Sequence, residues 1–122
     1  MKSPTIKPVA AVGLALAFAC GPSGAADLMA GQAAFEKFAC AACHGADGKS
    51  SVLPTYPVLA GQHADYLQHA LRSYQRGASG SGAVNTRSNA VMTALVPQLS
   101  DADIRNIAAW LSSLPSDLAV RR

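Results

Sequence analysis

The feature that most constrains this chain is a pair of cysteines, Cys40 and Cys43, separated by two residues and followed directly by His44. Cys-x-x-Cys-His is the attachment motif of c-type haem, in which each thiol forms a thioether with one vinyl group of the ring. The residue after the second cysteine then lies beneath the iron, where a neutral imidazole is a good ligand. The motif therefore predicts one covalent haem held by Cys40 and Cys43, with His44 as an iron ligand.

Three other uses of such a cysteine pair fit the chain less well. A thioredoxin-like redox pair requires a preceding strand, and no strand pattern precedes Cys40. A structural zinc site requires four ligands, and no second Cys/His pair follows at finger spacing. A plain disulfide would leave the adjacent His44 unexplained.

A haem would also explain how so short a chain obtains a core. The 122 residues are 50% hydrophobic, but only 6% are aromatic. Domains of this size often depend on a cofactor, a metal or covalent staples to bury enough apolar surface. We therefore expect one small domain built around its cofactor.

The first 26 residues are predicted to be a signal peptide. The start is basic, and residues 9–20 form an apolar run that is too short to span a bilayer. Small residues at 23–26 suit a signal peptidase. We expect residues 1–26 to be removed and residues 27–122 to form a cytochrome-type domain in the periplasm, the side of the membrane on which bacteria attach this haem.

Two alternatives for the N-terminal segment stay open: an uncleaved membrane anchor, and a lipoprotein with a lipidated Cys20. The residues before Cys20 fit a lipobox poorly because Phe18 is bulky. Cleavage after residue 26 removes two lysines and no acidic residue, so the formal net charge falls from +3 to +1. Two haem propionates would cancel even that, and we expect no nucleic-acid partner.

The apolar periodicity predicts an all-helical domain with two long loops, at residues 45–61 and 77–88. A short helix is expected at residues 29–38, with an inner face made of Ala30, Ala33, Ala34, Phe35 and Phe38. A second is expected at residues 63–76 and is stopped by Gly77; its apolar face is made of Leu67, Ala70, Leu71 and Tyr74.

The last helix is expected to start at Ser100, with Asp103 as its capping-box partner and Pro115 ending it. Its predicted buried residues are Ile104, Ile107, Ala108 and Leu111.

With the motif and the helices in place, residues 28–114 resemble a class I cytochrome c domain. The resemblance is closest to a single unit of the bacterial di-haem cytochrome c4 family and to its mono-haem relatives. It rests on residues 42–45, on residues 56–62 with Tyr66-Leu67 after them, and on Met92 followed by residues 99–104. One attachment motif implies one haem here.

The resemblance implies specific roles. Met92 matches the second iron ligand of the family, and Pro57 matches the proline whose carbonyl accepts the free ring N–H of the ligand histidine, here His44. Leu59 matches a leucine that packs on the haem. Gly31 and Phe35 match the pair of residues with which the first helix of the family crosses the last helix. In this chain the crossing is expected at Ile107 and Trp110.

Other polar residues have less certain roles. His63 and His69 are alternatives to Met92 as iron ligand, but we expect both to be exposed. Three loop residues could donate hydrogen bonds to a haem propionate or to the methionine sulfur, or could simply face water: Asn85, Arg87 and Asn89.

With both axial positions of the iron filled, the expected function is one-electron transfer rather than enzyme catalysis. The expected partners are redox proteins that dock briefly, either membrane respiratory complexes or periplasmic oxidoreductases, with no stable insertion of the mature domain into the membrane. A dedicated electron-transfer subunit of a dehydrogenase or reductase complex is the alternative, and a ligand-sensing or peroxide-reactive haem protein is a third possibility.

Overall fold

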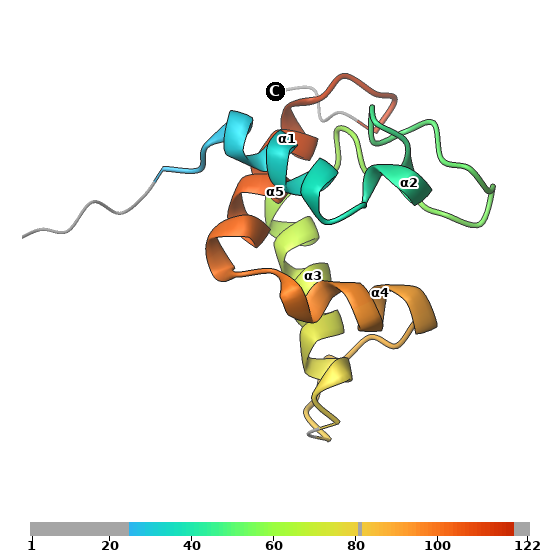
Figure 1. Cartoon of the computed structure of the whole chain (residues 1–122), viewed down its shortest axis with the longest axis vertical. Coiled ribbons are helices and arrows are strands. Elements are labelled where there is room, and N and C mark those ends of the chain that lie inside the picture. The colour runs from blue at the N-terminus through green and yellow to red at the C-terminus, as the bar shows by residue number, and fades with distance from the viewer. Residues whose placement is uncertain (1–24, 81, 119–122) are drawn as a thin grey trace, which may run out of the picture.

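The computed structural model describes residues 25–80 and 82–118, so the predicted signal peptide lies outside the described residues except for Ala25 and Ala26. That part of the chain contains helices and no strand, which confirms the all-α prediction (Figure 1). The elements are α1 (Leu28–Lys37), α2 (Ala41–His44), α3 (Ala64–Ala78), α4 (Ala90–Leu95), the short 3-10 helix η1 (Val96–Gln98) and α5 (Asp101–Ser113). Among these described helices, none has the length and apolarity needed to cross a membrane.

Helices α1 and α5 cross at close range, and Gly31 is the residue that permits the approach. A Cβ at residue 31 would lie 2.2 Å from the backbone oxygen of Asn106 and 2.8 Å from Cβ of Trp110. One turn further along α1, the ring of Phe35 packs on Trp110 with a centroid distance of 5.1 Å. The predicted crossing of the two terminal helices is therefore present, and Asn106 is an additional contact.

The predicted inner face of α1 was partly wrong. Ala34 and Phe35 are buried and Phe38 is half-buried, but Ala30 and Ala33 are exposed. Hydrophobicity alone cannot orient a helix rich in alanine, because an alanine side chain gains little from burial. The close crossing at Gly31 fixes the orientation instead.

Helix α3 packs against α5, and its buried residues are Leu67, Ala70 and Ser73. It does not stop at Gly77 as predicted, but continues to Ala78. A Cβ at residue 77 would lie 2.1 Å from the backbone oxygen of Arg87, so this glycine allows the following loop to pass close to the helix.

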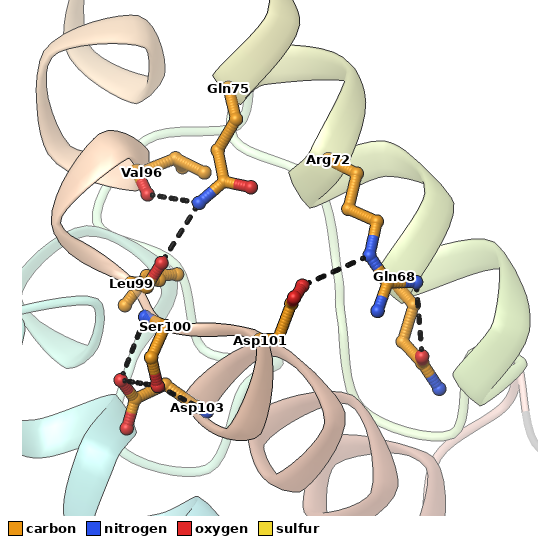
Figure 2. A network of polar contacts seen from close by, with 8 residues as sticks. All are labelled: Gln68, Arg72, Gln75, Val96, Leu99, Ser100, Asp101 and Asp103. Carbon is orange, nitrogen blue, oxygen red and sulfur yellow. Dashed lines mark hydrogen bonds and ion pairs between the residues drawn. The ribbon is translucent and has the colours of Figure 1, made fainter.

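The segment before α5 is held to α3 by side-chain hydrogen bonds (Figure 2). The amide of Gln75 donates to the carbonyl oxygens of Val96, at 3.3 Å, and Leu99, at 2.9 Å. The Arg72–Asp101 ion pair, at 3.6 Å, is largely exposed and contributes little stability. Of these polar contacts, the pair of bonds from Gln75 therefore constrains the segment more than the ion pair does.

Helix α5 begins as predicted. Ser100 caps it, and Asp103 completes a reciprocal capping box. The helix ends at Ser113, two residues before Pro115, and all its predicted buried residues are buried. The hydrophobic core is made of residues from α1, α3, η1 and α5, together with Leu99 between η1 and α5: Ala34, Phe35, Leu67, Val96, Leu99, Ile104, Ile107, Ala108, Trp110 and Leu111.

The crossing predicts the effect of Gly31→Ala. Alanine is favoured over glycine in a helix by about 1 kcal/mol, but here the added methyl meets the backbone of α5. We expect a net loss of about 1–3 kcal/mol in the free energy of unfolding, measured by denaturant titration of the holoprotein. The control is Ala33→Gly at an exposed position of the same helix, which should lose only the helix propensity, about 1 kcal/mol. A stabilised Gly31→Ala protein would contradict the close crossing.

Candidate functional site

All six predicted site residues line one cavity of about 340 Å³: Cys40, Cys43, His44, Pro57, Leu59 and Met92. This volume is within the range of roughly 300–1,000 Å³ typical of cofactor sites. Large apolar side chains from the helices complete the lining, among them Phe35, Leu67, Leu71, Leu95, Val96, Leu99 and Leu111. In Figure 1, α2 and α4 extend to the same side of α3, one above the other. The cavity is lined from both of these helices.

The first wall carries the two thiols. Helix α1 ends at Lys37, and Ala39 then takes a positive φ of 57°, which turns the chain into α2. Cys40 and Cys43 are half-buried and are not joined in a disulfide. Burial is the main reason why the pKa of Cys40 is raised above its ordinary value. This shift favours the protonated form of the thiol.

His44 is buried, with 6% of its surface exposed, and its Nδ1 lies 3.2 Å from the carbonyl oxygen of Pro57. This is the contact that the resemblance implied. Burial lowers the pKa of His44, although the hydrogen bond to Pro57 opposes the shift. A neutral imidazole that donates from Nδ1 keeps the lone pair of Nε2 free for a metal.

The loop at residues 45–61 holds Pro57 in place. It has no helix, as predicted, and it folds back on itself where the backbone N–H groups of Leu59 and Ala60 both donate to the carbonyl of Gly48. The N–H of Gly61 donates to the carbonyl of Leu111, which attaches the end of the loop to α5. The carbonyl beside His44 is therefore fixed by several backbone bonds.

Met92 reaches the cavity from the second wall. It lies in α4, a helix that the sequence analysis did not predict, and is half-buried against the core. The side chain of Asn89 caps this helix by accepting hydrogen bonds from the N–H groups of Val91 and Met92. An asparagine three residues before Met92 was the available signal for a helix start.

The other polar candidates have different surroundings. His63 and His69 are exposed, as predicted, and neither lines the cavity. Asn85 has a positive φ of 60°, and its carbonyl accepts from Arg76. Asn89 caps α4 and also lines the cavity. Arg87 lines the cavity beside Tyr66 and Tyr74.

The donor set fits a covalently attached haem. Two free thiols and a buried imidazole lie on one wall, a thioether lies on the other, and the space between is mostly apolar. An all-helical domain with this site belongs to the class of c-type haem proteins.

The comparison with known families agrees with this assignment. The family model of cytochrome c matches residues 28–115, and the chain belongs to the cytochrome c family. It therefore carries a c-type haem, attached through Cys40 and Cys43, and is an electron-transfer protein.

Individual relatives point the same way. The chain is 43% identical over 74 residues to cytochrome c-554(548) of Halomonas halodenitrificans, covering 61% of this chain and 82% of that one. It is 36% identical over 78 residues to a thiosulfate dehydrogenase electron acceptor of Stutzerimonas stutzeri, covering 64% of this chain and 32% of that one. The crystal structure of reduced cytochrome c4 from Pseudomonas stutzeri superposes with a TM-score of 0.65 at 39% identity, covering 75% of this chain and 47% of that one. The chain thus spans less than half of these two longer relatives.

Proposed function

We propose that the protein is a periplasmic one-electron carrier whose haem iron is bound by His44 on one face and by Met92 on the other. One observation carries this proposal. A buried imidazole from α2 and a thioether from α4, 48 positions apart in the sequence, line the same cavity as the two attachment cysteines. No other methionine follows the motif, and both other histidines are exposed.

The bound haem supplies a one-electron couple between ferric and ferrous iron. Met92 favours the ferrous state, because a thioether is a soft ligand, and thereby raises the reduction potential. His44 is held in one orientation and tautomer by Pro57, so the ligand geometry need not rearrange when the charge changes. The apolar lining acts on the same potential by excluding water.

Brief docking of a redox partner at the cavity mouth is supported by three exposed residues of its lining: Val58, Tyr66 and Val91. Redox encounters use small interfaces, and a few apolar side chains suit such a contact. A dedicated electron-transfer subunit remains the second candidate. The relatives called thiosulfate dehydrogenase electron acceptor favour it, because their name gives them one particular donor enzyme.

Export to the periplasm is part of the proposal and rests on residues 1–26. The intact mass of the protein purified from a periplasmic fraction should equal that of residues 26–122 or 27–122 plus one haem. Extraction with acidified organic solvent should leave the haem on the chain. A mass that includes Lys2, or a diacylglycerol on Cys20, would rule out cleavage at this site.

The ligand assignment predicts the behaviour of Met92 variants. Met92→His should keep a six-coordinate, low-spin haem but lower the reduction potential, because imidazole stabilises ferric iron more than a thioether does. Met92→Ala should open one axial position, so that the reduced protein binds carbon monoxide at neutral pH. Optical spectra in both oxidation states and a redox titration measure these effects.

The matched controls are His63→Ala and His69→Ala, which remove exposed imidazoles and should change neither the spectra nor the potential. If His69→Ala abolished the low-spin spectrum while Met92→Ala left it intact, the assignment would be wrong. The carrier function would then lose its main support.

A further inference from the structure

Among the described residues, those at the exposed mouth of the haem cavity are all uncharged. Six exposed residues line the cavity from the loop at residues 45–61, from α3, and from α4 with its cap: Thr55, Pro57, Val58, Tyr66, Asn89 and Val91. We call these six residues the mouth. Five of them lie in two segments, residues 50–62 and 88–100, whose sequences contain no lysine, arginine, aspartate or glutamate at all.

Exposed apolar side chains are concentrated around this mouth. Of the nine large hydrophobic side chains that are exposed in the described residues, Val58, Tyr66 and Val91 belong to the mouth. Val52 and Leu53 lie in the loop at residues 45–61, which extends to the same side of α3 as α4 does (Figure 1). Single exposed apolar residues are ordinary, but a group of them around one site indicates an interaction surface.

The loop that carries these apolar residues is held in one conformation by its own hydrogen bonds. The hydroxyl of Ser51 lies 3.0 Å from the carbonyl oxygen of Leu53 and 3.3 Å from that of Tyr56. The N–H of Tyr56 donates to the carbonyl of Leu53 at 3.0 Å. Because the loop is already ordered, a partner that docks on it loses little affinity to loop ordering.

One charged residue, Arg87, does line the cavity, but it is half-buried and does not belong to the mouth. Its guanidinium lies over the rings of Tyr66, at 5.3 Å, and Tyr74, at 6.0 Å, and also donates to the Tyr66 hydroxyl. The charge nearest to the mouth is therefore engaged by side chains of the same chain.

An uncharged mouth suits a partner whose own docking surface is uncharged. A charged partner surface would lose hydration on contact and would find no opposite charge among the six residues. A second copy of this chain meets the requirement, because its mouth is equally apolar and uncharged. The net charge hardly opposes the pairing, since residues 27–122 carry a formal net charge of only +1.

We propose that two copies of this protein dock mouth to mouth and exchange an electron. A copy in the ferrous state gives one electron to a copy in the ferric state, so the two copies trade oxidation states. No bond forms or breaks, and no proton or further reactant takes part. Six residues on each side are far fewer than the roughly 20–30 of a stable interface, so the pair is transient. The inference rests on the proposed function and identifies a second copy as a docking partner.

The first test is the rate of electron self-exchange of the wild-type holoprotein, measured from the NMR line widths of partly oxidised samples. The second-order rate constant should change by less than about twofold from low to high ionic strength, because salt screens only interactions between charges. Charged docking surfaces would give a steep dependence on ionic strength. Sedimentation should show a monomer in both oxidation states.

The second test places a charge in the mouth, by Val58→Glu on one wall or Val91→Glu on the other. When two copies of either variant meet, like charges approach each other, so the rate constant should fall roughly tenfold at low ionic strength and recover with salt. The matched control is Met29→Glu, which adds the same charge at an 83% exposed residue of α1 outside the cavity lining and should keep the wild-type rate. A mixture of Val58→Glu and Val58→Lys proteins brings opposite charges together and should exchange faster than either variant alone.

The proposal is overturned if Val58→Glu and Val91→Glu exchange electrons as fast as Met29→Glu does, since the contact would then lie elsewhere on the surface. A wild-type rate constant that changes about tenfold or more with ionic strength would also overturn it, because charged surfaces would then be meeting. If Val58→Glu loses the low-spin spectrum of the wild type, Val91→Glu decides the matter. A wild-type protein that is high-spin, or that binds carbon monoxide, would instead count against the proposed function.

Discussion

The two walls of the haem site are positioned by close approaches of one backbone to another, and glycine is required at both. At Gly31, α1 lies against the backbone of Asn106, so the helix that leads into the attachment motif is fixed on α5. At Gly77, α3 lies against the carbonyl of Arg87, so the loop that leads to α4 is fixed on α3. Because α3 itself packs on α5, the positions of both walls depend on α5.

These contacts explain how a domain with few large side chains maintains a precise site. Phe35 and Trp110 fill the space beside the first crossing, and Gln75 ties η1 to α3 beyond the second. Several other core residues line the cavity as well: Leu67, Val96, Leu99, Ile107 and Leu111. The cofactor therefore serves as part of the core, and its covalent attachment makes that part permanent.

Features encoded locally could be predicted from the sequence. The spacing of Cys40, Cys43 and His44 sets the attachment chemistry, and Ser100 with Asp103 sets the start of α5 within four residues of chain. Features that depend on distant contacts could not. Gly77 has the usual sequence signature of a helix end, but it lies within a helix, where the absence of a side chain allows the distant residue 87 to approach.

The second wall shows the same distinction. The resemblance to cytochrome c indicates Met92, but the six-residue helix that carries it has no periodic apolar pattern in the sequence, because it is short and buries no residue. The orientation of Arg87 was also unpredictable, since it depends on Tyr66 and Tyr74, which are more than ten positions away in the chain. A residue whose neighbours come from another element has no local pattern.

The most direct test of the account is the proton NMR spectrum of the reduced wild-type holoprotein. The ring current of a haem shifts the methyl group of an axial methionine far upfield of its ordinary position, into an otherwise empty part of the spectrum. The account predicts one such three-proton resonance, assigned to Met92. A Met92 methyl at its ordinary position, with shifted ring protons of His63 or His69 in its place, would contradict the central claim that His44 and Met92 hold the iron from opposite faces.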